Sequence, residues 1–344
     1  MNMNASIETA DRPDRSAAVE HKVTLVEAVN LALAREMEND ESVVLLGEDI
    51  ATNGGVFRAT VGLKERFGYK RVMDTPLAEN LIAGVTIGMA TQGLRPVAEF
   101  QFLGFIYAGF EQIISHASRM RNRTRGRLHC PLVYRAPFGG GIHAPEHHSE
   151  STEALFAHIP GLRVVIPSSP QRAYGLLLAA IRNPDPVIFL EPKRIYRAVT
   201  QTVRDNGEAL PLDVCFTLRE GDDVTLISWG ASIMETLQAA DRLAEQGVSA
   251  EVIDVATISP LDRETLLCSV AKTGRAVIVH EACRNGGVGA EIAASIAEGA
   301  FLDLQAPVVR VTGYDTVMPY YRNEQNYLPG VDDIVAAVEQ VIAL

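Results

Sequence analysis

Helical segments alternate with short apolar strands in the pattern of apolar and polar positions along the chain. Apolar residues at helical spacing predict a first helix over residues 24–38. These residues are Leu25, Ala28, Val29, Ala32 and Leu33. The segment Thr24-Leu-Val-Glu27 has the form of a capping box at the start of this helix. Continuous apolar runs follow at 43–46, 97–100, 132–135, 164–166 and 187–190. Such strands, separated by helices, are typical of a parallel sheet that is covered on both faces.

A second alternating series begins at residue 224, after a polar and irregular stretch between about 198 and 220. It predicts a strand at 224–229, a helix at 231–246, a strand at 250–255, a helix after Ser259-Pro260, strands at 276–280 and 308–311, and a closing helix at 331–343. We therefore predict an α/β fold with two doubly wound domains and mainly parallel sheets. The predicted divisions are a solvated tail at 1–21, a first domain at 22–200, a linker at 201–220 and a second domain at 221–344.

Composition and charge narrow the class of protein. The 344 residues are 47% hydrophobic and 22% charged, which is ordinary for a globular protein with two cores. The net charge of −12 argues against a nucleic-acid partner, and no apolar stretch reaches the roughly 18 residues of a membrane span. The four cysteines lie far apart without a C-x-x-C pair, and the first twenty residues lack the features of a signal or transit peptide. We expect a cytoplasmic protein.

The segment Asp74-Thr-Pro-Leu-Ala-Glu79 is the densest candidate for chemistry. Thr75 can cap a helix and Pro76 can occupy its first position, which would place Glu79 in the opening turn. A carboxylate there would be fixed and partly desolvated. The alternative is that Glu79 only complements the helix dipole. Further along, Gly84 and Gly88 form a small-residue ridge that suits a tight subunit contact or internal packing equally well.

A second candidate is the glycine-rich loop from Phe138 to Ser151. Three consecutive glycines, 139–141, allow conformations that are closed to other residues, and His143, His147 and His148 gather within six positions. A metal site is the alternative interpretation, although the cluster lacks H-E-x-x-H or another recognised ligand spacing. Gly287 and Gly289 follow an apolar run and resemble part of a dinucleotide fingerprint, but Ile292 stands where glycine or alanine is wanted. A tight strand-to-helix turn is the better interpretation of that segment.

Several motifs together resemble the β subunits of pyruvate, branched-chain 2-oxo acid and acetoin dehydrogenases. They occur in the family's order at Gly47-Glu-Asp49, Asp74–Glu79, Arg95–Phe100, His148-Ser-Glu-Ser151, Pro160-Gly-Leu162 and Val187–Pro192. The resemblance covers about residues 22 to 344. It implies a thiamine-diphosphate pyrimidine-binding domain followed by a transketolase C-terminal-like domain. Agreement of several motifs in order and spacing makes this resemblance specific.

The resemblance implies roles for individual residues. Glu79 matches the glutamate that bonds the ring nitrogen of the cofactor's aminopyrimidine, and a proton shared there activates the ring as a base. Positions matching Glu48, Leu77, Gln101 and Phe105 surround the aminopyrimidine, although Leu77 and Phe105 could equally be core residues. His148 matches the histidine that assists substrate binding or acyl transfer to lipoamide, with His147 one residue off the pattern. We therefore predict Glu79 and His148 as the catalytic residues.

Partners and ions follow from the same resemblance. This chain has no Gly-Asp-Gly, the motif with which related enzymes hold magnesium and the cofactor's diphosphate. An α subunit should supply that half-site, in an α2β2 assembly that serves a dihydrolipoyl acyltransferase core. Potassium in this subunit type is held by main-chain oxygens at positions that match Leu132, Val133, Ala180, Asn183 and Asp185.

Three functions from different classes fit these observations. The first is oxidative decarboxylation of a 2-oxo acid with acyl transfer to a lipoyl group, either by a pyruvate or branched-chain enzyme or by an acetoin dehydrogenase. The second is a non-catalytic assembly subunit of the same fold, against which the intact Glu79 and His148 speak. The third is a nucleotide-binding oxidoreductase, supported only by the incomplete glycine run. Segments 139–148 and 191–196 are similar to both pyruvate and branched-chain enzymes. We take pyruvate as the working prediction.

Overall fold

The computed structural model describes residues 19–344, so most of the predicted tail at 1–21 lies outside the described residues. Residues 19–21 belong to strand β1 (Val19–Thr24), which pairs antiparallel with β8 (Thr200–Asp205). This two-stranded ribbon joins the start of the first predicted domain to the segment that follows it. None of the helices within residues 19–344 is long and apolar enough to cross a membrane.

The first sheet has the strand order β12-β6-β7-β5-β4-β2-β3. Its strands are β2 (Val43–Gly47), β3 (Val72–Asp74), β4 (Arg95–Glu99), β5 (Val133–Phe138), β6 (Arg163–Val165), β7 (Val187–Pro192) and β12 (Thr257–Ser259). Neighbouring strands run parallel, except that β12 lies antiparallel to β6. All five predicted apolar runs of the first domain form strands of this sheet, and the predicted mainly parallel architecture is confirmed.

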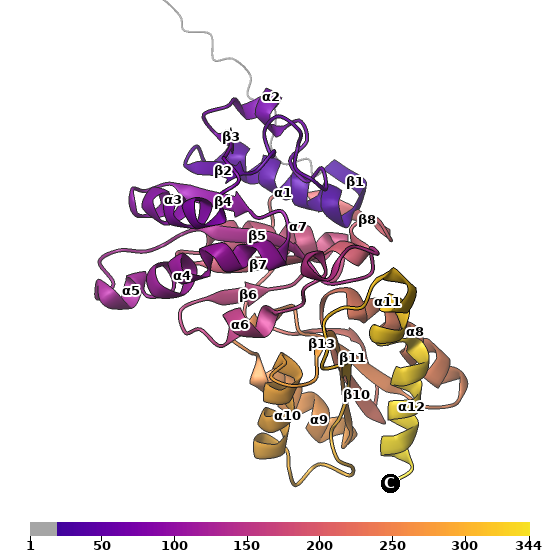
Figure 1. The fold of residues 1–344 in the computed structure, drawn as a ribbon. Coiled ribbons are helices and arrows are strands. Elements are labelled where there is room, and N and C mark those ends of the chain that lie inside the picture. The colour runs from indigo at the N-terminus through magenta and orange to yellow at the C-terminus, as the bar shows by residue number, and fades with distance from the viewer. Residues whose placement is uncertain (1–18) are drawn as a thin grey trace, which may run out of the picture.

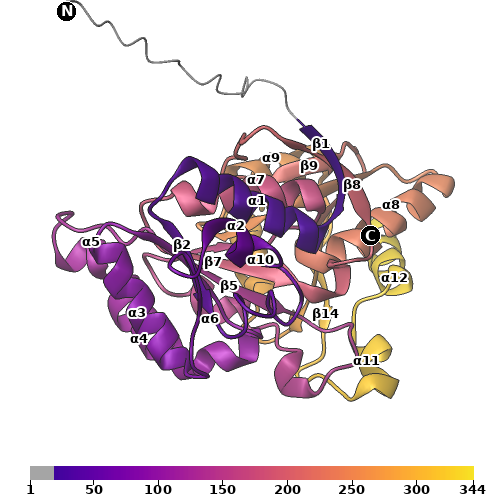
Figure 2. The same cartoon turned by 90° about the horizontal axis from the view of Figure 1, so that it is seen from above.

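Both faces of the first sheet are covered, which explains why its strands are continuously apolar. Val133 on β5 packs into the core beneath α1 (Leu25–Asn39) and α7 (Pro170–Arg182), whereas its neighbour Tyr134 packs on the opposite face with residues of α3 (Glu79–Thr91). Helices α1 and α7 lie side by side, as Figure 2 shows from above. The capping box at α1 is confirmed: the Glu27 carboxylate accepts hydrogen bonds from the Thr24 backbone N–H at 2.8 Å and from its hydroxyl at 2.7 Å.

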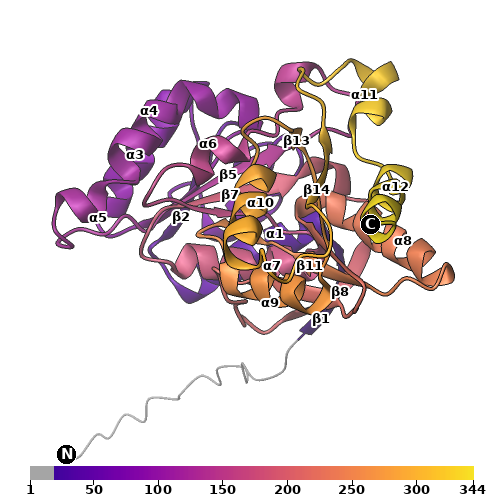
Figure 3. The same ribbon diagram turned by 90° about the horizontal axis from the view of Figure 1, so that it is seen from below.

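The second sheet has the order β14-β13-β10-β11-β9. Its strands are β9 (Phe216–Arg219), β10 (Val224–Ser228), β11 (Ala250–Asp254), β13 (Ala276–Cys283) and β14 (Val309–Gly313). Only β9 is antiparallel to its neighbour. Helices α8 (Ile233–Glu245) and α12 (Val331–Ile342) cover one face, and α9 (Arg263–Thr273) and α10 (Val288–Gly299) cover the other (Figure 3).

The segment between the two sheets differs from the irregular linker predicted at 201–220. Its first residues belong to β8 and its last to β9, so both ends are hydrogen-bonded into strands. The sequence does not predict these two strands because most of their side chains are polar or partly exposed. Both strands lie at edges of their sheets, and of their residues only Val203 on β8 is fully buried. We retain 22–200 and 221–344 as the proposed domains, with the boundary inside this segment.

One cluster of buried apolar residues spans both domains, so they pack as a single body (Figure 1), and a separate cluster lies within the second domain between its sheet and helices α8 and α12. Trp229, after β10, packs in the same cluster of buried apolar residues as Phe138, at the end of β5. The short strand β12 also comes from the second part of the chain and extends the first sheet. The remaining helices are α2 (Leu63–Phe67), α4 (Phe110–Gln112), α5 (Met120–Arg123), α6 (Glu153–Ala157) and α11 (Tyr321–Tyr327).

Candidate functional site

The predicted site residues follow the carboxyl ends of neighbouring parallel strands. Glu48 comes directly after β2, Glu79 follows β3, and Gln101 and Phe105 follow β4. His148 lies in the loop after β5. Because these four strands are parallel neighbours in the order β5-β4-β2-β3, their carboxyl ends meet at one edge of the sheet. Ligands of open α/β sheets bind at this edge.

Glu79 opens helix α3, but the predicted start of that helix is wrong. The helix begins at Glu79 itself with Ala78 as N-cap, so neither is Thr75 the cap nor Pro76 the first helical residue. The Thr75 N–H instead donates to the Gly47 carbonyl at 2.9 Å, which ties the segment to the end of β2. Glu79 is half-buried in the first turn, where the helix dipole favours a carboxylate.

Glu48 is a buried carboxyl beside Glu79. Only 6% of it is exposed, and its Oε1 has no hydrogen-bond partner among residues 19–344. Burial, followed by the charges of Glu79 and Asp49, raises the pKa of Glu48. Two neighbouring carboxyls of which one is desolvated are suited to holding and exchanging a proton.

The segment η1 (Leu103–Gly109) brings the two halves of the site together. Gly109 allows its backbone to approach that of Glu79, since a Cβ at this position would lie 2.9 Å from the Glu79 carbonyl oxygen. Gly104 allows an even closer approach to the histidine loop, where a Cβ would lie 2.2 Å from the His147 carbonyl oxygen. A larger residue at Gly109 would push η1 away from Glu79, and a larger residue at Gly104 would push η1 away from His147.

His148 lies against the aromatic side chains of η1 and its N-cap. The ring centroids of Phe105 and His148 are 5.1 Å apart with the planes at 78°, and Phe102 approaches His148 to 4.6 Å. The His148 Nδ1 is buried and has no partner within the described part of the chain. His147 is the more exposed neighbour, with Nδ1 3.8 Å from Glu150. The aromatic contacts fix the position of the His148 ring.

The third histidine of the loop points elsewhere. His143 Nδ1 lies 2.7 Å from a carboxylate oxygen of Glu324 on α11. Within residues 19–344, no group of three or more His, Cys, Asp or Glu side chains is arranged to hold a metal ion.

Comparison with known proteins agrees with the two-domain α/β fold. The sequence model described as "Transketolase, pyrimidine binding domain" matches residues 21–199, and "Transketolase, C-terminal domain" matches 215–334. The chain is 48% identical over 319 residues to the pyruvate dehydrogenase E1 component subunit beta of Acholeplasma laidlawii, covering 93% of this chain and 98% of that one. Identity to the Bacillus subtilis subunit of the same name is 46% over 321 residues, covering 93% and 99%.

The chain belongs to the family of pyruvate dehydrogenase E1 component β subunits. A solved structure described as "Split gene transketolase, inactive beta4 tetramer" superposes with a TM-score of 0.78 over 94% of this chain and 99% of that one. At 24% identity it shows that the two chains share a fold.

In this E1 β chain, Leu77 does not belong to the core. It is 80% exposed, and Leu81 and Val85 continue an exposed apolar row along α3. Gly88 on the same helix has open space around it, whereas Gly84 faces Gln112 on α4. The glycine ridge therefore packs internally at one end and is exposed at the other. Contiguous exposed apolar residues of this kind mark interaction surfaces.

Of the five residues predicted around potassium, Leu132 and Val133 lie at the start of β5, which the segment after α7 contacts, and Ala180, Asn183 and Asp185 lie at the end of α7 and in that segment. The Pro184 carbonyl accepts the Cys130 N–H at 3.1 Å, and the Leu132 carbonyl accepts the Val187 N–H at 3.0 Å. The Ala180 carbonyl accepts the Asn183 N–H at 3.2 Å, and Val133 lies in β5. The Asp185 carboxylate pairs with Arg121 at 2.6 Å.

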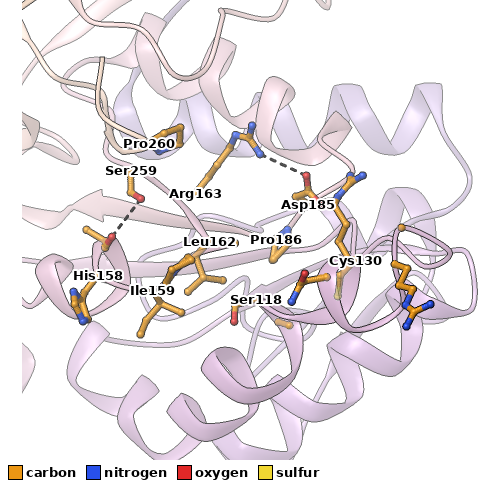
Figure 4. Close-up of a pocket in the computed structure, with 18 residues that line it drawn as sticks. Ser118, Cys130, His158, Ile159, Leu162, Arg163, Asp185, Pro186, Ser259 and Pro260 are labelled. Carbon is orange, nitrogen blue, oxygen red and sulfur yellow. Dashed lines mark hydrogen bonds and ion pairs between the residues drawn. The ribbon is translucent and has the colours of Figure 1, made fainter. Parts of the chain in front are cut away.

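A cavity of about 820 Å³ adjoins the segment after α7 (Figure 4). Asp185 and Cys130 line one side, and Ile159, Leu162 and Pro260 line the other. None of Glu48, Glu79 or His148 lines it, so it is separate from the candidate site.

The glycine run of the second domain forms the predicted strand-to-helix turn. Strand β13 ends at Cys283, and α10 begins at Val288 with Gly287 as its N-cap. Gly287 and Gly289 both lie against the buried ring of His280, where a Cβ would approach to 3.0 and 2.5 Å. Internal packing therefore accounts for these glycines.

Four residues around the site were not predicted from the sequence: Phe102, Lys193, Glu281 and Glu324. Lys193 directly follows the apolar strand β7, and Glu281 interrupts the apolar run of β13. An ionisable residue in or beside a buried strand is the signal that could have identified these two, because burying a charge is costly unless it has a partner. No comparable signal marks Glu324, which lies in a polar helix.

Proposed function

We propose that this chain is the β subunit of a thiamine-diphosphate-dependent pyruvate dehydrogenase, which decarboxylates the 2-oxo acid and passes the acyl group to the lipoyl group of a dihydrolipoyl acyltransferase. The observation that carries the proposal is the convergence of Glu48, Glu79 and His148 at the carboxyl edge of the first sheet. Identity of 48% to a protein named as this subunit supports the choice of pyruvate.

The residues at this edge fit the aminopyrimidine end of the cofactor. Phe105 offers an aromatic face, and Leu77 an exposed apolar side chain. Glu48, Glu79 and Gln101 offer polar atoms, of which the buried Oε1 of Glu48 has no partner in the described chain. When bound, thiamine diphosphate would supply the electron sink for loss of carbon dioxide. Glu79 would hold the proton at the ring nitrogen, and His148 would serve the substrate end.

The diphosphate and its magnesium ion belong, in this proposal, to an α subunit. The chain contains no Gly-Asp-Gly, so it lacks the motif that holds them in related enzymes. The exposed apolar row Leu77, Leu81 and Val85 begins beside Glu79 and suits a partner surface that closes over the cofactor. In an α2β2 assembly, the apolar row of this chain and the diphosphate-binding surface of the α subunit would form one site.

Two further parts of the proposal concern ions and location. Potassium would be held by main-chain oxygens of Leu132, Val133, Ala180, Asn183 and Asp185. The carbonyls of Leu132 and Ala180 each accept one hydrogen bond, which leaves a second lone pair for a cation.

We place the protein in the cytoplasm, in keeping with its four unpaired cysteines.

Cofactor titration of the chain with and without its α partner tests this function. Calorimetry should detect tight thiamine diphosphate binding, in the presence of magnesium, by the co-purified pair and none by the isolated chain. On the same pair, turnover of pyruvate should exceed that of 3-methyl-2-oxobutanoate at least tenfold. Tight binding by the isolated chain, or none by the pair, would overturn the half-site proposal, and the opposite substrate order would overturn the choice of pyruvate.

The register of the histidine loop gives a second prediction. His148→Ala should lower acylation of a lipoyl domain by the α2β2 assembly about a hundredfold, the lower end of what a positioned acid or base contributes. His147→Ala should change it less than threefold, because the His147 side chain is half exposed and the ring of His148 lies against Phe102. The mass of the lipoyl domain reports acylation directly. The reverse pattern would show that the assignment is off by one residue.

A further inference from the structure

Carboxylates of the second domain reach into the glycine-rich loop that carries His148. Glu281 on β13 is 6% exposed and accepts hydrogen bonds from the Gly140 N–H at 3.1 Å and from the Ser151 hydroxyl at 2.6 Å. One carboxylate thus contacts the beginning and the end of the loop. The approach is close, since a Cβ at Gly139 would lie 2.2 Å from a Glu281 oxygen.

Glu324 on α11 contacts the next part of the same loop. It is 1% exposed and accepts the N–H groups of Gly141 at 2.5 Å and His143 at 2.9 Å. The same carboxylate also lies 2.7 Å from His143 Nδ1, which fixes the side chain of that residue. Hydrogen bonds to a charged acceptor are stronger than neutral ones. The backbone around His143 is therefore held by the second domain.

Lys193, a residue of the first domain, contacts the same loop. Its ammonium group donates to the carbonyls of Gly139 and, at 2.7 Å, of His148 itself. Burial lowers the pKa of Lys193 to about 8, against the opposing charges of Glu281, Glu324 and Glu150. This cation links Gly139 to His148 and compensates the charges of the carboxylates that contact the loop.

Packing alone does not fix the loop on this side. A cavity of about 350 Å³ lies between its last residues, Ser149 to Thr152, and the second-domain side chains Cys283, Met318 and Tyr327. The loop has few internal backbone bonds, among them Gly139 N–H to Glu150 O and His148 N–H to Pro145 O. A segment beside a void depends on its hydrogen bonds for a defined position.

We propose that Glu281, Glu324 and Lys193 are positioning residues that hold His148 at the substrate end, so that the second domain contributes to catalysis through this loop. The proposal rests on the role proposed above for His148. Misplacement of a reacting group by about 1 Å can cost roughly a hundredfold in rate. Loss of a carboxylate that holds the loop should therefore impair the reaction without touching the cofactor.

A double-mutant cycle in the reconstituted α2β2 assembly tests this. Glu281→Ala should lower kcat/KM for lipoyl acylation at least tenfold in the native background and less than twofold in the His148→Ala background, because it acts through His148. Thiamine diphosphate affinity should stay within twofold. Glu281→Gln should recover part of the loss, since its amide oxygen can still accept the Gly140 N–H.

Glu251→Ala is the matched control. Glu251 is also a buried carboxylate of the second domain, bonded to the Ser269 hydroxyl and paired with Lys272, and does not contact the loop. Glu251→Ala should lower the free energy of unfolding about as much as Glu281→Ala and leave the rate of lipoyl acylation unchanged. If Glu281→Ala does not assemble, Glu324→Ala and Ser151→Ala take its place in the same cycle. Equal losses in both backgrounds, or none in the native one, would overturn the positioning role, whereas full acylation by His148→Ala would overturn the proposed function instead.

Discussion

Glu79→Gln should lower turnover by about 10²–10⁴-fold while leaving the fold intact. Glutamine has the shape of glutamate and still offers an oxygen at the start of α3, so packing around the helix terminus should change little. It has no proton to hold or hand over at the aminopyrimidine nitrogen, and proton transfer by a positioned side chain contributes about 10²–10⁴-fold. We expect kcat for pyruvate to fall by about that factor, with an artificial electron acceptor as readout.

Glu111→Gln provides the matched control for this prediction. Glu111 is likewise a glutamate in the first turn of a helix, α4, but its side chain is 62% exposed and has no proposed contact with the cofactor. Its turnover should equal that of the native assembly. Turnover of Glu79→Gln within tenfold of the native value, in an assembly that still binds thiamine diphosphate, would remove Glu79 from the acid–base role.

The sequence predicts those parts of the fold and site that depend on neighbouring residues. Apolar spacing from Leu25 to Leu33, with Glu27 as the capping partner, is a local pattern, and α1 forms where that pattern places it. Buried parallel strands need continuous apolar runs, so β2 and β7 stand out in the sequence. The grouping of Glu48 with Glu79 comes from the family resemblance, and it agrees with the structure because parallel strands place their carboxyl ends at one edge.

Features that depend on distant parts of the chain are not visible in the sequence. Thr75 is a good cap locally, but its N–H bonds to Gly47, and this contact delays the start of α3. The contacts of Glu281 and Glu324 with the histidine loop span 141 and 183 residues. Strand β8 is polar because it pairs at an edge with β1. In each case the deciding partner comes from another element, so local propensity gives the wrong or no answer.

Arg135→Met should destabilise the chain more than any other substitution proposed for it. Arg135 is 1% exposed and lies between two buried carboxylates, with Nη1 2.9 Å from Glu99 and Nε 2.6 Å from Glu191. Methionine fills a similar volume but leaves two buried anions unpaired, a change that typically costs about 3–5 kcal/mol. We expect poor assembly, or a lower urea midpoint of the co-expressed α2β2 protein.

Arg263→Met is the control for this prediction, because Arg263 pairs at 2.7 Å with Glu291 in a bridge exposed on both sides. Such a pair is worth about 0–1 kcal/mol. Adding Glu99→Gln and Glu191→Gln to Arg135→Met should restore much of the midpoint, since the unpaired charges, and not the missing guanidinium, account for the loss. A midpoint that stays low in the triple variant would assign the cost to packing.

Glu99 ends β4 just before Gln101, and Glu191 precedes Lys193. The charge cluster therefore anchors the strand ends from which both halves of the site project, and its repair should return activity together with stability.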